Sequence, residues 1–171
     1  MSAGEVRRLI PHRRNPETQL LGKVPHPDHV EPCDLDGDGR EDYVVADLGS
    51  FLPEDHDRGK VVWLRGNMPD QEPVVLLEGV GRVADVQPAD FDQDGDQDLV
   101  VAEFGWRRTG RLWLLEQIAS QGSVPQFRRR VLDDRHGLIH TPVVDLDRDG
   151  HLDFVALFSQ EFESIEAFLN R

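Results

Sequence analysis

The chain has 171 residues, of which 38% are hydrophobic and 7% aromatic, and its formal net charge is −14. This length can build one domain with a sizeable core, and the composition argues against a chain that is disordered throughout. Because phosphate groups are bound by clustered Lys and Arg, the acidic balance and the shortness of the basic runs predict that nucleic acid is not a partner.

The first segment, residues 1–15, contains two arginine pairs and a proline, and we expect a flexible lead-in there. It lacks the hydrophobic stretch of a secretory signal. No later apolar run approaches the roughly 20 residues that a membrane-spanning helix needs, so we expect no insertion into a membrane. Residues 16–171 are expected to hold the folded repeats described next.

The first strong pattern is a nine-residue acidic run at 34–42, of the form DxDxDGxxD. It is preceded by a candidate strand at 29–33 and followed by Tyr-Val-Val-Ala at 43–46, a run typical of a buried strand. Two more candidate strands follow at 61–64 and 73–77. The acidic run is therefore expected to be a loop that joins two strands of a four-stranded unit.

The same arrangement recurs twice, with acidic loops at 90–98 and 145–153. The first aspartates of the three loops, Asp34, Asp90 and Asp145, lie 56 and 55 residues apart. Four short strands in each unit of this length are typical of a propeller blade. We therefore predict an all-β fold of β-propeller type, with about three four-stranded blades.

The acidic loops have the chemistry of a metal site. Carboxylates crowded into nine residues repel one another, and a hard cation with oxygen ligands relieves this repulsion. Calcium is the first candidate, with about three ions, because positions 1, 3, 5 and 9 offer carboxylates, position 7 offers a backbone carbonyl, and glycine at position 6 permits a sharp turn. The candidate ligands are Asp34, Asp36, Asp38, Arg40 and Asp42 in the first loop, Asp90, Asp92, Asp94, Asp96 and Asp98 in the second, and Asp145, Asp147, Asp149, His151 and Asp153 in the third.

Two other interpretations of the loops are weaker. A helix-loop-helix calcium hand requires a glutamate at position 12, where this chain has Val45, Val101 and Ala156. Solvated turns also use Asp and Gly, but three copies in register favour metal binding over turn chemistry alone.

Residues 18–171 carry a family resemblance. The acidic loop followed by a Val-Val-Ala strand, with Phe104–Gly105 after the second copy, resembles the FG-GAP and VCBS repeat proteins, whose best-known members form the integrin alpha-subunit propeller. The third copy departs from the pattern, with Leu-Phe-Ser at 157–159. The resemblance implies a calcium-stabilised β-propeller, with each metal in the hairpin between the first and second strands of a blade.

The number of blades and the calcium loops shape the expected role. Propellers usually have at least four blades, so we expect a piece of a longer propeller or two chains that self-assemble into a six-bladed ring. Weak calcium loops would be mostly empty in a low-calcium cytosol, which favours an extracellular or periplasmic location. We expect an interaction or scaffold module with a protein or glycan partner, and no catalytic residues.

An alternative function, a carbohydrate-binding or polysaccharide-active propeller, would use the face opposite the calcium loops. The enlarged loop Phe51–Arg58 and Trp106 are candidate binding elements there. Trp63 and Trp113 are expected at equivalent places in the third strand, packed between blades. The polar candidates are His26, His29, Asp47, Glu103, Arg107, His136 and His140, of which His29 and His140 share one repeat position and fit structural caps.

Overall fold

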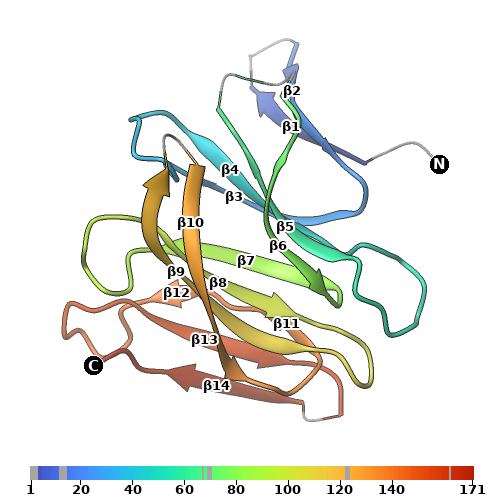
Figure 1. The fold of residues 1–171 in the computed structure, drawn as a ribbon, viewed down its shortest axis with the longest axis vertical. Coiled ribbons are helices and arrows are strands. Elements are labelled where there is room, and N and C mark those ends of the chain that lie inside the picture. Colours follow the sequence, from blue (N-terminus) through green and yellow to red (C-terminus); the bar gives the residue numbers. More distant parts are fainter. Residues whose placement is uncertain (1–3, 12–14, 67, 69–70, 122–123, 162) are drawn as a thin grey trace.

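A computed structural model describes residues 4–11, 15–66, 68, 71–121, 124–161 and 163–171. The strands of these residues form three four-stranded antiparallel sheets and one two-stranded sheet (Figure 1). Among the described residues there is no helix long and apolar enough to cross a membrane. The predicted fold class is confirmed: each large sheet is consistent with a propeller blade, and the described blades do not close a ring.

The strands of each blade follow the chain order, with the acidic loop between the first and second strands. The first blade contains β3 (Pro27–Cys33), β4 (Asp42–Asp47), β5 (Gly59–Leu64) and β6 (Val74–Val80). The second contains β7 (Val83–Ala89), β8 (Asp98–Glu103), β9 (Arg111–Gln121) and β10 (Val124–Asp133). In the third, β11 (Leu138–His140) and β12 (Val143–Val144) pair with β13 (Asp153–Phe158), which also pairs with β14 (Ser164–Phe168).

The blades pack face to face because their second strands are apolar on both sides. Val44 and Ala46 of β4 share one buried cluster with Leu99 and Val101 of β8. The other face of β8 faces the third blade. The cluster there includes Val100, Ala102, Phe154, Ala156 and Phe158. Figure 1 shows the result, three sheets stacked in chain order.

The two tryptophans of the third strands both lie between the first and second blades, as predicted, but at different register positions. Trp63, which is 0% exposed, pairs with Val44. The residue of the second blade equivalent to Val44 is Val100, but Trp113 pairs with the next residue, Val101. Because neighbouring residues of a strand point to opposite faces, Trp63 points forward from the first blade and Trp113 points back from the second. The expectation that they are equivalent is therefore wrong.

The N-terminal segment forms a hairpin on the outer face of the first blade. Strand β1 (Gly4–Ile10) pairs with β2 (Glu17–Val24), and Val6 and Val24 are buried against Tyr43, Val45 and Leu64. This differs from the flexible lead-in expected for residues 1–15, because the side chain of Val6 packs against apolar surface on the outer face of the first blade. Residues 1–3 and 12–14 lie outside the described part, and the boundary at residue 16 stays a prediction.

The outward face of the third blade has no such cover among the described residues. Phe154 and Ala156 point toward the second blade. Val155 and Leu157 alternate with them and point to the opposite face. Ile165 pairs with Leu157 and is 74% exposed. The stack of blades thus has a covered end and an open end.

Candidate metal centres

Three groups of aspartates converge in the hairpins that enter the second strand of each blade. In each group, three carboxylate oxygens lie within 4.8 Å of one another. The groups are Asp34, Asp36 and Asp42; Asp90, Asp92 and Asp94; and Asp145, Asp147 and Asp153. The other predicted ligands lie in the same loops but outside these groups, namely Asp38, Arg40, Asp96, Asp98, Asp149 and His151.

The first aspartate of each loop holds the glycine at position 6. The glycine N–H donates to Oδ2 of the aspartate at 2.9 Å in the first loop, 3.1 Å in the second and 3.2 Å in the third. The three glycines, Gly39, Gly95 and Gly150, have φ values of 81°, 97° and 92°. A side chain at such φ values is strained, so the turn requires glycine at this position.

The aspartates at positions 3 and 5 form repeated side-chain turns. In every loop the N–H of position 5 donates to Oδ1 of position 3 at 3.3 Å. The N–H of position 7 donates to Oδ1 of position 5 at 2.9 Å, 3.0 Å and 2.9 Å. Asp side chains form such turns readily because they reach the backbone two residues ahead. The loop conformation is therefore specified locally and is the same three times.

The aspartate at position 9 bonds each loop to the third strand or to the residues just after it. Asp42, Asp98 and Asp153 are 3%, 1% and 0% exposed. Each accepts a hydrogen bond at Oδ2 from the N–H of position 2, at 3.3 Å, 3.2 Å and 2.8 Å. Each also accepts one at Oδ1 from a residue within the third strand or just after it. These second donors are the N–H groups of Gly66, Gln117 and Asn170, at 2.7 Å, 2.8 Å and 2.9 Å.

The carboxylates fit a divalent cation with oxygen ligands. Oδ1 of Asp34 is buried and has no hydrogen-bond partner among the described residues, and the same is true of Oδ1 of Asp96. Burial, followed by the charges of Asp42 and Asp38, raises the pKa of Asp36. A buried carboxylate oxygen without a donor is costly, and a hard cation satisfies several at once.

The first loop has a neighbour that sequence spacing did not indicate. Nη2 of Arg65 lies 3.5 Å from Oδ2 of Asp36, and its guanidinium lies over the Trp63 ring, 4.6 Å from the centroid. Strand register places Glu116 and Leu169 at the equivalent position of the other blades. The first acidic loop is therefore the only one of the three, within the described chain, with an arginine at this position.

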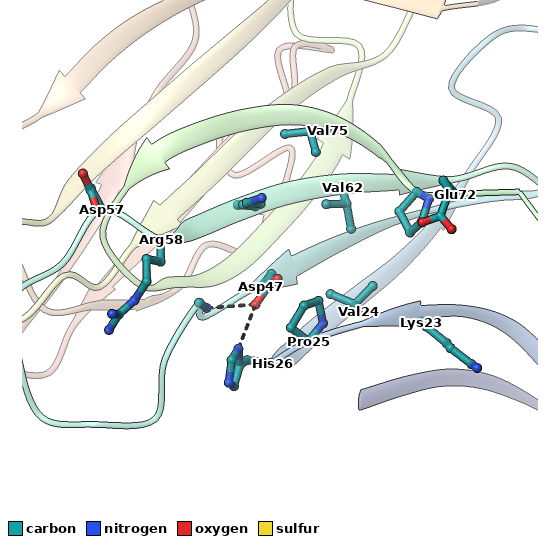
Figure 2. A pocket seen from close by; sticks show the side chains of 13 residues that line it. Lys23, Val24, Pro25, His26, Asp47, Asp57, Arg58, Val62, Glu72 and Val75 are labelled. Atoms are coloured by element: carbon teal, nitrogen blue, oxygen red, sulfur yellow. Dashed lines mark hydrogen bonds and ion pairs between the residues drawn. The ribbon is translucent and has the colours of Figure 1, made fainter. Parts of the chain in front are cut away.

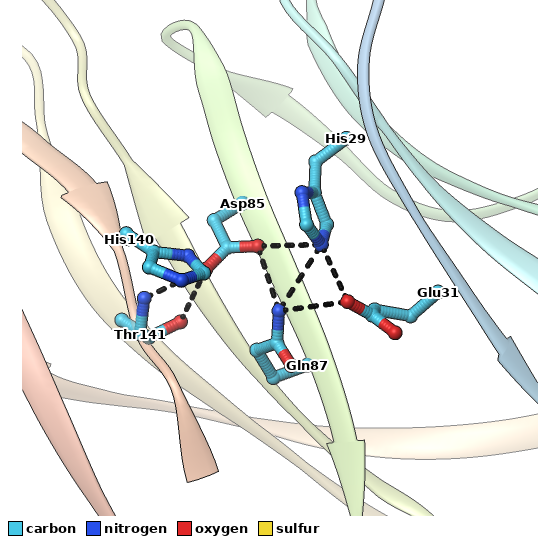
Figure 3. Close-up of polar contacts among 6 residues, drawn as sticks. All are labelled: His29, Glu31, Asp85, Gln87, His140 and Thr141. Carbon is cyan, nitrogen blue, oxygen red and sulfur yellow. Dashed lines mark hydrogen bonds and ion pairs between the residues drawn. The ribbon is translucent and has the colours of Figure 1, made fainter.

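On the inner strands, a hydrogen-bonded cluster joins all three blades (Figure 3). Asp85 of β7 is 0% exposed. Its Oδ2 accepts from the Thr141 N–H at 2.6 Å and lies 2.7 Å from Nδ1 of His140. Its Oδ1 accepts from Nε2 of Gln87 at 3.0 Å and lies 3.2 Å from Nε2 of His29. These contacts fit the interpretation of His29 and His140 as structural caps.

The other candidate histidines lie elsewhere. His26 lies edge-on to Phe51, with 4.9 Å between ring centroids, and its Nδ1 is 3.8 Å from Oδ1 of Asp47. Nε2 of His136 lies 3.4 Å from Oε2 of Glu161. The structure therefore brings together only His29 and His140 of the four predicted histidines.

A pocket lies against the first blade and reaches the end opposite its acidic loop (Figure 2). Its volume is about 680 Å³, and its lining combines apolar and charged side chains. Among the lining residues are Lys23, Val24, His26, Asp47, Arg58 and Val62. Phe51 and Leu52 of the enlarged loop are 71% and 62% exposed.

The enlarged loop is anchored on the second blade. Arg82, which is buried, donates to the backbone carbonyls of Ser50, Glu54 and Gly105 at 3.2, 2.9 and 2.8 Å. Oδ1 of Asp55 accepts hydrogen bonds from the N–H groups of residues 107, 108 and 109. These bonds lower the pKa of Asp55 to about 2, with the Arg108 N–H making the largest contribution. The enlarged loop, with the exposed Phe51 and Leu52, is therefore held in place by hydrogen bonds to the second blade.

Fold and site together define a class of protein: four-stranded antiparallel blades with an acidic, cation-type loop between the first two strands. Residues 34–101 match the family model described as FG-GAP-like repeat, which confirms the predicted resemblance over this segment. The match begins at the first acidic loop and ends in β8, after the second loop. The chain matches no curated protein.

Proposed function

We propose that the chain is a calcium-binding β-propeller repeat module that acts as an interaction or scaffold domain in an extracellular or periplasmic setting. The observation that carries the proposal is the threefold repetition of one loop geometry, with three converging carboxylate oxygens in each loop. Calcium accepts six to eight oxygen ligands in flexible geometry, whereas magnesium requires a near-ideal octahedron and keeps several waters. Clustered carboxylates with carbonyls nearby therefore favour calcium.

The expected ligand shell extends beyond the converging groups. Asp38 and Asp149 at position 5 and the backbone carbonyls of Arg40, Asp96 and His151 at position 7 would complete it. Asp98 is proposed to shape the second site through its two backbone hydrogen bonds and through its charge. Three ions would reduce the net negative charge from −14 to −8 and relieve the repulsion within each loop.

A non-catalytic interaction role is favoured on the surface opposite the calcium loops. Phe51 and Leu52 are exposed on a loop that Arg82 and Asp55 hold in place. Exposed apolar side chains on a fixed loop are typical of a surface for a protein partner. The adjacent pocket, with His26 and Asp47, supports the second candidate, a carbohydrate-binding or polysaccharide-active site.

Calcium titration of chelator-treated protein and ligand screening together test the proposal. Calorimetry should count about three calcium ions per chain, with much weaker binding of magnesium. The calcium-loaded module is then screened against a peptide library and a glycan array, alongside a Phe51→Ser/Leu52→Ser variant. Peptide binding that the variant loses supports the interaction role, and glycan binding that a His26→Ala variant loses supports the alternative. Absence of calcium binding would refute the calcium-module proposal.

Acidification is expected to weaken calcium binding at the second loop. Burial is the main reason that the pKa values of Asp96 and Asp98 are raised to about 6. Because these raised pKa values mean that the folded chain binds the protons more tightly than the unfolded chain, protonation stabilises the cation-free fold. This stabilisation is fully present below the ordinary aspartate pKa and is lost as the pH rises through about 6. Calcium binding favours the ionised carboxylates. At about pH 5 both groups are mostly protonated, and the loss of each proton on calcium binding lowers the calcium affinity roughly tenfold.

The pH dependence is measured by calcium titration at about pH 7.5 and about pH 5, with Asp96→Asn as the matched variant. The variant has one titrating group fewer, so its affinity should depend less on pH than that of the parent. Equal affinity of the parent's second loop at both pH values would contradict the assignment.

Assembly is proposed to proceed through the third blade. A six-bladed ring of two copies would have to seat the open face of one third blade on the other copy's first blade. The β1–β2 hairpin covers that surface through Val6 and Val24. We therefore favour additional blades beyond the third as the means of ring completion, and a ring of two copies would require the hairpin to move.

A further inference from the structure

The second acidic loop contacts the third through Gln93. Nε2 of Gln93, at position 4 of its loop, donates to the carbonyl of Gly150 at 2.9 Å and lies 3.1 Å from Nδ1 of His151. Within the third loop, Asp145 accepts a hydrogen bond from the Gly150 N–H, and Asp149 accepts one from the His151 N–H. The glutamine therefore contacts the turn that positions the carboxylates of the third loop.

A second connection runs in the opposite direction through Asn170. Its backbone N–H donates to Oδ1 of Asp153, and its side-chain amide donates to the carbonyl of Phe91 at 2.6 Å. Phe91 lies between Asp90 and Asp92, two members of the second carboxylate group. One residue thus links a carboxylate of the third site to the backbone of the second.

Backbone geometry at position 4 shows what the glutamine adds. Gly37, Gln93 and Arg148 occupy this position with φ values of 70°, 62° and 65°. A residue other than glycine is strained in this left-handed region. The first loop uses glycine and has no side chain with which to reach the second loop. In the second loop, glutamine at the same backbone position reaches Gly150 and His151 of the third loop.

We propose that the cation sites of the second and third loops are coupled through Gln93 and Asn170, so that filling one raises the affinity of the other. The first loop fills independently. The inference rests on the proposed function, since it assumes that the loops bind calcium. A cation that orders one loop also fixes the groups of that loop to which the other loop is hydrogen-bonded. The second cation then pays a smaller entropy cost when it orders its own loop. The coupling is reciprocal, so either site can be filled first.

Each loop contains its own reporter, the amide of its position-6 glycine. In a ¹⁵N-labelled, chelator-treated chain titrated with calcium, the signals of Gly95 and Gly150 should shift over one calcium range and that of Gly39 over another. In Gln93→Gly/Asn170→Ala the two ranges should separate, with the weaker site losing about fivefold in affinity. Glycine suits the φ at position 93, and Asn170→Ala keeps the backbone bond to Asp153, so the variant should fold.

Arg148→Gly is the matched control, because it makes the same change at the same backbone position of the third loop while keeping both connections. It should leave the Gly95 and Gly150 midpoints together. Unchanged midpoints in Gln93→Gly/Asn170→Ala, with all three glycine signals still shifting, would overturn the coupling and leave the proposed function standing. Signals that do not shift with calcium in the parent would overturn the proposed function and the coupling with it.

Discussion

Calcium is expected to raise the thermal unfolding midpoint of the chain by about 15 °C or more relative to the same protein in EDTA. A ligand that binds only the folded state stabilises it by about 2.7 kcal/mol for each site when its free concentration is 100 times Kd. For a chain of this size, 1 kcal/mol shifts the midpoint by about 2–4 °C. Three sites therefore give a large shift, and millimolar magnesium a much smaller one.

Variants of single loops show how much each site contributes to the calcium-dependent rise in the unfolding midpoint. Asp36→Ala and Asp92→Ala each remove one converging carboxylate. Asp36→Ala should lose about a third of the calcium-dependent rise, and Asp92→Ala should lose more, because the third site is coupled to the second. Asp134→Ala removes an exposed aspartate outside the loops and should behave as the parent does. Calorimetric melting curves that coincide for Asp92→Ala and the parent in calcium would show that the second loop is not a structural cation site.

Asp85→Ala should strongly destabilise the fold, with a loss of about 2–5 kcal/mol in the free energy of unfolding. Asp85 accepts hydrogen bonds from both the N–H and the hydroxyl of Thr141, which is itself 0% exposed. Each buried donor left without an acceptor costs about 1–3 kcal/mol. His29 and His140 would also lose the group that connects them across the blades.

Urea unfolding in saturating calcium measures this effect while the loops stay filled. Asp85→Asn is the matched variant, because it keeps the shape and one acceptor oxygen and should lose less than Asp85→Ala. An Asp85→Ala protein as stable as the parent would show that the inner-strand cluster contributes little to holding the blades together.

The fold class and the acidic loops could be predicted because they are specified locally. The Asp and Gly residues of 34–42 form their own turns, and the short apolar runs that follow, rich in β-branched residues, are typical of buried strands. The same local rules act in 90–98 and 145–153, which is why the three loops share their hydrogen bonds. The position-9 aspartates were correctly expected in the loops, but their bonds to Gly66, Gln117 and Asn170, in or just after the third strands, were not anticipated.

Features that depend on contacts between distant segments could not be predicted in this way. The register of β9 differs from that of β5 by one residue relative to the tryptophans, and a shift of one residue changes the face of a side chain. Strand β1 forms because Val6 finds apolar surface on the first blade. Gln93 and Asn170 join loops that lie more than 50 residues apart in sequence, at positions that the nine-residue motif leaves free.

The covered first blade and the open third blade give the stack a direction of growth. A repeat added after the third blade would meet Leu157 and Ile165 much as the third blade meets the second. A repeat added ahead of Pro27 would first have to displace the β1–β2 hairpin from Val45 and Leu64. Duplication of this unit during evolution could therefore lengthen the array after its third blade while its beginning stayed unchanged.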